Sequence, residues 1–557
     1  MKRNVILTHI EPLESRIAPA VFVVNVLGDP SVSTTGQLSL REAVNDANAH
    51  GGSNTIVFKP GLHGAIFLNS AALSITNDNL TIIGPGGNKL GINATNHSEI
   101  FSIDTSKVSI SGLALLDGEN TAGNGGAIYS KGPLTINNCV ISGSTAIKGG
   151  GIFDSTTGAF SLTNSVVSLN TATSGSNHGY GGGLYVKAGG GIVISGSKIT
   201  GNSANGYAGG MYLILPSADS ANLVIQNSVI SGNSEGYTGA VGIFNNSSHA
   251  AKVLISDSQV TGNSASGGTS ALLIESDGGT SFITGSIVAN NSASSSGGDL
   301  YLEGSAAVVI QGSRFSGNTA GKDGGGIYVE GGLPSLTISK STIIDNRAAF
   351  GGGGIYMAAA ATNLNVVGSV IAENHSVGNG AGIDLYSNTG TTLITASTIA
   401  SNESGAAGGG ACLLSSGKIT VQSTHVTGNV ATDDGGGVYL GSSGLHNTFS
   451  GNTFANNNSA AEGGGLYIGS SGGFSITSGS FTGNVAGGGG GAIFIGVTPT
   501  GAIHTPAVLI TGNQSVGSGG GVTHILGATG TVTMKTTVIT GNIGPAKTDN
   551  YYGSFTA

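Results

Sequence analysis

Hydrophobic residues occur in this chain as short runs separated by glycine, serine and asparagine, and the same order of runs recurs along most of the sequence. Each unit contains an apolar-x-x-Asn segment, then a run of glycines, then two or three apolar residues. In the unit from Gly324 to Asn346, this pattern predicts three short strands, at 327–329, 336–338 and 341–343. The units lack the 3.6-residue period of an amphipathic helix.

The repeat predicts an all-β fold in which the units stack. Its asparagines recur about every 28 residues, which is enough chain for one turn of a solenoid. Three short strands cannot enclose a core alone, but stacking lets each strand pair in parallel with the same strand of the next unit. We therefore predict a single-stranded right-handed parallel β-helix. The repeated asparagines are Asn170, Asn202, Asn233, Asn263, Asn291, Asn318, Asn346, Asn374, Asn402, Asn429, Asn457, Asn484, Asn513 and Asn542.

Two polar columns accompany the apolar ones. A serine stands five residues before the asparagine in nine successive units and shares strand parity with an apolar residue, so both are predicted to point inward. Cys139 holds the serine position in the first unit and is too many coils from Cys412 for a disulfide. Stacked amides can donate and accept along the axis. We interpret the asparagines as a structural ladder.

A segment near the N-terminus predicts the one helix. Ser39 and Glu42 have the spacing of a capping box, and the apolar residues between 40 and 47 share one helix face. We predict a helix over residues 39–48 that covers the open end of the β-helix, where strand edges would otherwise be exposed.

The expected organisation has four parts. Residues 11–20 resemble the LE-x-R leader of large secreted repeat proteins, and Ala18-Pro19-Ala20 has the small-x-small form of a cleavage site. The parts are an export leader at 1–20, a cap with irregular first coils at 21–118, the regular β-helix at 119–542 and a C-terminal tail at 543–557.

Two motifs resemble known bacterial surface proteins. The segment Leu38-Ser39-Leu40-Arg41-Glu42-Ala43-Val44 resembles the CSLREA segment that precedes β-helices, with Leu38 in place of its cysteine. Units such as Gly325-Gly326-Ile327 and Phe315-Ser316-Gly317-Asn318 are similar to the GGxI and FxxN repeats of polymorphic outer membrane proteins. The resemblance implies a pectin lyase-like fold and a secreted or surface-attached, often adhesive, protein of a Gram-negative bacterium.

The amino-acid composition excludes several classes of partner and site. The formal net charge is −9 and the chain has only five arginines, so a nucleic-acid partner is not expected. No apolar run reaches the ~18 residues of a spanning helix. Two cysteines exclude a disulfide-rich scaffold and a cysteine zinc site.

An aromatic column is the first candidate site. One aromatic residue follows the glycines in many units, between apolar residues of opposite parity, so its ring is predicted to face outward. Such rings could bind a glycan or a protein surface, or could form a self-stacking ladder that stabilises the sheet. The column contains Tyr129, Phe153, Tyr185, Tyr212, Phe244, Tyr301, Tyr328, Tyr356, Tyr439, Tyr467 and Phe494. The preferred ligand-binding candidates are Tyr301, Tyr328, Tyr356, Tyr439 and Tyr467.

Carboxylates on neighbouring coils give a possible catalytic site. Asp345 and Glu373 precede the asparagine in adjacent units, about 4.8 Å apart by rung spacing, with Arg347 nearby. Two carboxylates at such a distance occur in retaining glycosidases. Exposed turn residues are the other interpretation, and it is the one we expect.

A second acidic cluster could bind a metal. Asp433, Asp434 and Glu462 lie just before glycine runs in adjacent units and could contribute to a Ca²⁺ site, although Ca²⁺ requires six to eight oxygen ligands. A solvated acidic edge is the alternative, and no cofactor is otherwise expected.

The sequence therefore favours an exported, non-enzymatic β-helix with an adhesive or structural role. A polysaccharide lyase or glycoside hydrolase on the same scaffold is the alternative, because the fold alone does not decide function. The oligomeric state is not indicated.

Overall fold

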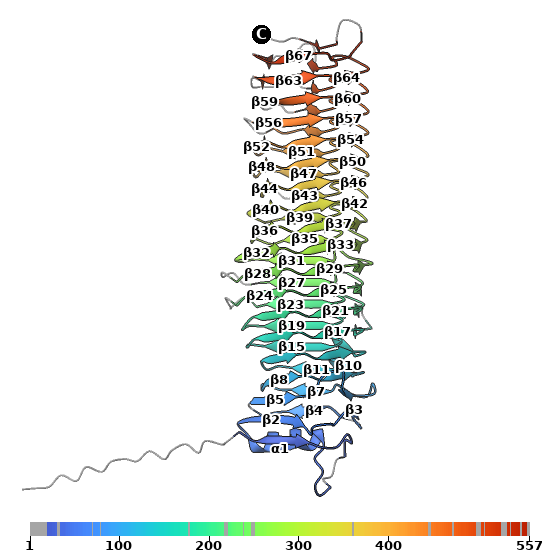
Figure 1. Ribbon diagram of the computed structural model, residues 1–557, viewed down its shortest axis with the longest axis vertical. Coiled ribbons are helices and arrows are strands. Elements are labelled where there is room, and N and C mark those ends of the chain that lie inside the picture. The colour runs from blue at the N-terminus through green and yellow to red at the C-terminus, as the bar shows by residue number, and fades with distance from the viewer. Residues whose placement is uncertain are drawn as a thin grey trace, which may run out of the picture.

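The chain folds as a right-handed parallel β-helix of about 16 turns. Figure 1 shows a straight rod with its N-terminal coils at one end and its C-terminal coils at the other. The computed structural model describes residues 19–30, 34–69, 71–77, 79–175, 179–216, 221–237, 239–246, 251–358, 361–443, 447–469, 473–496, 503–505, 507–524, 532–534, 536–545 and 549–553.

A regular coil contains four strands, one more than the sequence predicts. One coil consists of β39 (Ile327–Gly331), β40 (Ser335–Ser339), β41 (Thr342–Ile344) and β42 (Arg347–Ala348). The fourth, β42, follows the asparagine and has only two residues, which is too short to leave a hydrophobic pattern.

Three parallel sheets result, and the structure groups the strands differently from the prediction. Strands of the β40 and β41 kind form one 35-stranded sheet, called here the wide sheet. Strands of the β42 kind form a 15-stranded sheet, the narrow sheet. Strands that follow the glycines form the third, the aromatic sheet. Its strands are β4 (Leu73–Ile75), β7 (Phe101–Ile103), β11 (Ile128–Ser130), β15 (Ile152–Thr156), β19 (Leu184–Ala188), β23 (Met211–Leu215), β27 (Val241–Asn245), β31 (Leu272–Ser276), β35 (Leu300–Glu303), β39, β43 (Ile355–Met357), β47 (Ile383–Asn388), β51 (Ala411–Ser415), β55 (Val438–Leu440), β58 (Leu466–Ile468), β61 (Ile493–Ile495), β65 (Val522–His524) and β68 (Tyr551–Tyr552).

The core follows from strand parity. Ile327 pairs with Ile355 on the next coil and Val329 with Met357, and all four side chains are fully buried. Tyr328, between them, is only partly buried and faces outward. Stacking the same position coil after coil therefore builds one continuous apolar core inside the rod.

The asparagine ladder is confirmed. Asn346 is fully buried and accepts hydrogen bonds from the backbone N–H and the Nδ2 of Asn318, at 3.2 and 2.8 Å. Its own Nδ2 donates to Asn374 Oδ1 at 3.0 Å and to the carbonyl of Phe315 at 3.2 Å. Each asparagine thus links its turn to the turns on both sides.

The serine column and its cysteine substitute are also confirmed. The backbone N–H of Ser341 donates to Ser369 Oγ on the next coil at 3.2 Å. Cys139 occupies the same column, and its N–H donates to Ser165 Oγ at 3.1 Å. Cys139 and Cys412 are both buried and free, as predicted.

The predicted helix is present and covers the first coil. Helix α1 (Leu40–His50) begins at Ser39, whose hydroxyl accepts from the N–H of Glu42 while the Glu42 carboxylate accepts from the N–H of Ser39. It lies between β1 (Val21–Val24) and β2 (Ser53–Phe58), which pair in parallel. Its buried apolar residues join the core at the lower end of the rod in Figure 1.

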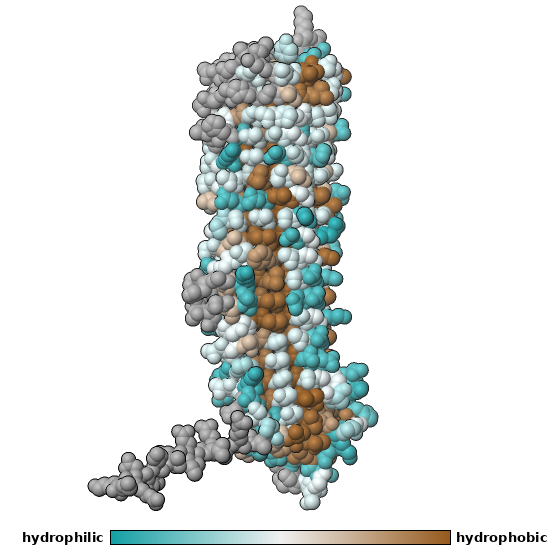
Figure 2. All heavy atoms as spheres, turned by 60° about the vertical axis from the view of Figure 1, so that its left-hand side comes forward, coloured by the Kyte–Doolittle hydropathy of each residue, from teal (hydrophilic) through white to brown (hydrophobic). Residues whose placement is uncertain are grey.

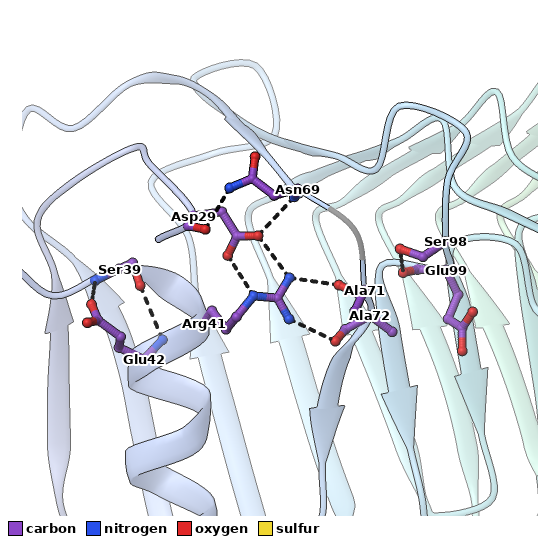
Figure 3. A network of polar contacts seen from close by, with 9 residues as sticks. All are labelled: Asp29, Ser39, Arg41, Glu42, Asn69, Ala71, Ala72, Ser98 and Glu99. Atoms are coloured by element: carbon purple, nitrogen blue, oxygen red, sulfur yellow. Dashed lines mark hydrogen bonds and ion pairs between the residues drawn. The ribbon is translucent and has the colours of Figure 1, made fainter. Parts of the chain in front are cut away.

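An ion pair fixes this helix to the coils (Figure 3). Arg41 Nε and Nη2 donate to the two carboxylate oxygens of Asp29 at 2.8 and 2.9 Å. The same guanidinium donates to the carbonyls of Ala71 and Ala72 at 2.7 and 3.0 Å. Asp29 also accepts from the N–H of Asn69 at 3.0 Å. One arginine therefore links α1 to two segments of the first coils.

The two terminal regions of the chain can be compared with the four parts predicted from the sequence. Between 21 and 118, β2 pairs with β5 (Asn79–Ile83) and β5 with β8 (Lys107–Ser111), so these residues do form early coils. Within the predicted tail, β68 pairs with β65 and extends the aromatic sheet. The predicted leader lies outside the described residues up to residue 18. In the described part of the chain, no helix has the length and hydrophobicity to cross a membrane.

The outer face of the wide sheet carries an apolar stripe. Val193, Val224, Leu254, Phe282 and Val309 occupy one outward register position on five successive coils. Figure 2 shows a hydrophobic band along the long axis of the rod. Val193 is exposed and the other four are partly buried, so these side chains shield one another as cross-strand neighbours.

Candidate functional site

Outward rings on the aromatic sheet form three ladders. In the first, Tyr129, Phe153, Tyr185 and Tyr212 stack with centroid separations of 5.0 to 5.4 Å. Tyr301, Tyr328 and Tyr356 form the second, at 5.0 and 5.4 Å. Tyr439, Tyr467 and Phe494 form the third, at 4.9 and 5.4 Å. The outward direction predicted from parity is correct.

The column is interrupted twice. Between the first and second ladders, Gly242 and Leu273 hold the aromatic position, and between the second and third it is held by Asp384 and Cys412. The inclusion of Phe244 in this column is wrong, because Phe244 pairs with Ile214, two residues further along the strand. Its ring nevertheless packs 4.6 Å from that of Tyr212, over the side-chain-free Gly242.

Stacking decides which rings can meet a ligand. A ring inside a ladder has both faces covered by its neighbours and presents only its edge. Tyr328 and Tyr467 are enclosed in this way. A ring face is free of a neighbouring ring only where a ladder ends; Tyr301 is such an end, and 8% of it is exposed, toward a groove that it lines. Of the five predicted ligand-binding tyrosines, Tyr328 and Tyr467 are therefore primarily structural.

A fourth ladder runs beside the first. Tyr180, Tyr207 and Tyr237 stack at 5.0 and 5.6 Å, and the Tyr180 ring meets Tyr212 edge-on at 5.2 Å. Lys148 pairs with Tyr180 on the adjacent coil, and its Nζ lies 5.0 Å from the ring centroid of Tyr180 and 5.5 Å from that of Tyr185. These tyrosines precede the glycine runs, and this shared position in the sequence is the signal that could have identified them.

The first interruption opens a groove of about 400 Å³, called here the notch. Its floor is Leu273, whose side chain is shorter than the rings in the same column. Phe244 and Tyr301 stand on either side of Leu273 along the rod axis. The residues that line it are Tyr180, Tyr207, Tyr212, Phe244, Thr269, Leu273, Glu275, Tyr301 and Glu303.

Two carboxylates flank the notch along one edge. Glu275 and Glu303 pair in register on adjacent coils, so their side chains leave the sheet side by side. Burial raises the pKa of Glu275 above its ordinary value, and the negative charges of Glu303 and Asp277 raise it further. The notch thus combines aromatic walls with an acidic edge, at which the carboxylates of Glu275 and Glu303 repel one another.

The second interruption holds a buried acid. Asp384 is only 3% exposed and stands between Tyr356 and Cys412 in the outward column. Burial, with a smaller contribution from Asp323, raises the pKa of Asp384 to about 7. Asp323 in turn accepts a hydrogen bond from the N–H of Gly351 at 2.8 Å. A carboxyl group that titrates near neutrality thus lies in this gap.

The suggested catalytic group lies elsewhere, on an exposed turn. Asp345 and Glu373 adopt left-handed conformations, with φ of 54° and 55°, at the position where most other coils have glycine. Both are exposed, and Asp345 Oδ1 lies 3.9 Å from Nη2 of the exposed Arg347. The grooves lined by residues 19–135 and by residues 180–303 do not include them. Their placement matches that of exposed turn residues.

The acids considered for calcium lie near one another but do not converge. The N–H of Glu462 donates to Asp434 Oδ1 at 3.0 Å. Burial and the charge of Asp433 raise the pKa of Asp434, and burial with the charges of Asp434 and Asp433 raises that of Glu462. Among the described residues, no three histidine, cysteine or carboxylate side chains are grouped as metal ligands.

Comparison with known proteins agrees with the fold. The family model described as a right-handed β-helix region matches residues 90–283, 268–399 and 373–498. The search of curated proteins gives no significant match. Among solved structures, the A-module of a mannuronan C-5 epimerase from Azotobacter vinelandii is similar over 79% of this chain and 94% of that chain, at 14% identity and a TM-score of 0.26. A TM-score this low supports no inference about substrate or mechanism.

Proposed function

Because the chain belongs to the right-handed β-helix family, a scaffold that serves both binding proteins and enzymes, we propose that it is an exported, non-enzymatic rod that binds a glycan at the notch. The observation that carries this proposal is the break in the aromatic column at Leu273, where a groove of about 400 Å³ is bordered by aromatic rings and two carboxylates.

The chemistry of the lining suits a sugar. Ligand sites generally combine an apolar wall with a few placed polar groups. Here the rings of Phe244 and Tyr301 supply surface on which the C–H groups of a pyranose can pack. Glu275 and Glu303 supply acceptors for hydroxyl hydrogens along one edge.

The placement of the two glutamates favours binding over hydrolysis. In a glycosidase, the two carboxyl groups flank the scissile bond. Glu275 and Glu303 instead occupy one register column and approach a ligand from the same side. Their spacing of about one rung, ~4.8 Å, is that of any neighbouring pair in a parallel sheet.

Filling the notch tests the proposal. In Leu273→Tyr, an additional ring should complete the aromatic column and occupy the groove, so binding detected on a glycan array should fall at least tenfold while thermal stability is kept. The matched control is Tyr467→Ser, which removes a ring from the third ladder and should leave binding unchanged. Equal binding by wild type and Leu273→Tyr, or a complete lack of glycan binding by the wild type, would contradict the proposal.

Export is the second part of the proposal and rests on the resemblance of residues 11–20 to a secretion leader. Fractionation of a Gram-negative host should find the full chain outside the cytoplasm and a variant without residues 1–18 inside it. Cytoplasmic retention of both would remove this part and leave the binding proposal intact.

Asp384 provides a specific reason to test the alternative, glycan cleavage. A buried carboxyl group with a pKa near 7 is suited to proton donation at neutral pH. If the gap beside Tyr356 is a catalytic site, reducing-sugar release or unsaturated product should be lost in Asp384→Asn and kept in the control Glu373→Gln. A lack of product from the wild type on the glycans that it binds would exclude this candidate.

A further inference from the structure

The ionisable groups at the notch are of one sign. Besides its tyrosines, the only ionisable side chains among its lining residues are Glu275 and Glu303. Asp277 lies close enough for its charge to act on Glu275. A ligand rich in carboxylates, such as a polyuronate, would meet this edge with like charge and without a cation to neutralise it.

The acidic edge is also uncompensated in the protein itself. Glu275 is partly buried, and within the described residues no basic group forms an ion pair with it or with Glu303. Two carboxylates held on adjacent coils repel one another, and the repulsion grows as water is excluded. A ligand cation between them would relieve that repulsion.

The chain already places an ammonium group against rings of the same ladders. The Nζ of Lys148 lies over Tyr180, which also lines the notch, and near Tyr185, which precedes Tyr212 in the first ladder. A cation over an aromatic face is attracted by the ring quadrupole, most strongly when the cation is partly desolvated. Lys148, on the coil next to that of Tyr180, therefore shows how an amine can pack against rings of this sheet.

We infer that the notch takes a glycan whose sugars carry free ammonium groups, a deacetylated hexosamine chain, with an ammonium between Glu275 and Glu303 and the sugar ring over Leu273. This inference rests on the proposed glycan binding and names its substrate class. A hexose without an amine would use only the apolar floor and hydroxyl contacts, and an N-acetylated one would bring a neutral, bulkier group to the acidic edge.

Calorimetric titration tests this preference for ammonium-bearing sugars. The four ligands are the hexamers of glucosamine, of N-acetylglucosamine, of a uronic acid and of lysine. The glucosamine hexamer should bind at least tenfold more tightly than the other sugars, and added salt should weaken its binding because the contact is ionic. In Glu275→Gln/Glu303→Gln its affinity should fall at least tenfold. Glu303→Gln alone changes an exposed side chain and should show part of the loss if the double variant does not fold. Glu373→Gln, on the exposed turn, is the matched control.

The outcomes separate this inference from the proposal beneath it. Equal or tighter binding of the acetylated or uronic hexamer, abolished by Leu273→Tyr, would overturn the inference and retain glycan binding. Binding of the lysine hexamer alone would overturn both in favour of a basic peptide. Glucosamine binding that is unaffected by the double variant would also overturn the inference. No binding of any hexamer would overturn the inference, while the glycan array would still decide the proposed glycan binding.

Discussion

At the scale of the residue, the asparagine is the side chain that connects one coil to the next. Its amide both donates and accepts, so a single residue can satisfy backbone groups of two neighbouring turns, where serine or threonine could satisfy fewer. Since backbone groups in a buried turn need partners, the same residue is repeated wherever the chain turns inside the solenoid. Fully buried Asn346, with hydrogen bonds to Asn318, Asn374 and Phe315, is representative.

Replacing one rung of this ladder should be costly. Asn346→Ala removes the acceptor used by the N–H and Nδ2 of Asn318 and the donor to the Phe315 carbonyl. Asn374 Oδ1 loses one of its two donors and keeps the backbone N–H of residue 346. We expect the free energy of unfolding to fall by about 2–5 kcal/mol, measured by denaturant titration. Asn365→Ala, on the outer face, is the control and should cost under about 0.5 kcal/mol. Equal effects of the two variants would show that the ladder does not contribute as described.

Asp154 should make stability depend on pH. Its side chain is fully buried at an inward position, and burial raises the pKa of the carboxyl group to about 8, with the Ser130 hydroxyl opposing the shift. Between the ordinary value of 3.8 and about 8, the folded state keeps a proton that the unfolded state has lost. Unfolding therefore becomes easier as pH rises through this window.

The variant Asp154→Asn tests that linkage. The amide is neutral at every pH, so the variant should be more stable than the wild type at pH 8, on the order of a few kcal/mol, with a smaller difference at pH 4. Chemical unfolding at several pH values gives the comparison, and Asp345→Asn on the exposed turn is the control. A wild type whose stability rises between pH 5 and 8 in parallel with the variant would refute the assignment.

Parity along the strand could have identified Asp154 from the sequence. In Ile152-Phe153-Asp154, the first and third residues share a face, so an outward Phe153 implies an inward Asp154. Leu273 is harder to find. It continues an outward column that also contains rings, and only the side-chain volumes of three neighbouring coils reveal that its smaller size makes a groove.

At the scale of the element, the capping helix is the part that local sequence specifies best. Ser39 and Glu42 form the predicted capping box, and the apolar face of α1 packs onto the core. The clamp from Arg41 to Asp29 and to the carbonyls of Ala71 and Ala72 was not predictable, because its partners lie 12 to 31 residues away. It depends on how the first coil closes.

Loss of the Arg41 interactions should destabilise the packing of α1 on the first coil. Arg41→Ala leaves the nearly buried Asp29 carboxylate without its counter-ion, a change that typically costs about 3–5 kcal/mol. Hydrogen exchange should accelerate in α1 and β1 and stay unchanged in coils near β58. Arg314→Ala, an exposed arginine of the wide sheet, is the control. Unchanged exchange in α1 would mean that apolar packing alone holds the cap.

The elements that sequence reasoning missed are short or displaced. The strand after each asparagine has two residues in most coils, so it leaves no alternating pattern to detect. Phe244 was placed in the wrong column because the register of β27 against β23 puts Gly242 opposite Tyr212. Strand register is set by pairing with the neighbouring coil, and distance from the glycine run is only an approximate guide to it.

At the scale of the whole molecule, the place of a residue in the sequence determines its position along the axis of the rod. Lys131, Lys148 and Lys187 lie in the coils below the notch, and the acidic residues Glu275 and Glu303 flank the notch itself. Each coil contacts only its neighbours, so a substitution in one column changes the surface locally without altering the fold elsewhere. The sequence could predict the rod, its ladders and Tyr301. It could not predict the notch, which exists only where coils with different side chains are stacked.

The most direct test of the account is a hydrogen-exchange map of the wild-type protein with and without a saturating glycan ligand chosen from the array. We predict slower exchange on binding in residues 269–275 and 299–303, at the notch, and no change in residues 435–440 and 463–468 of the third ladder. Protection confined to the third ladder, to the apolar stripe of the wide sheet or to the coils around Asp384 would contradict the assignment of the notch as the binding site.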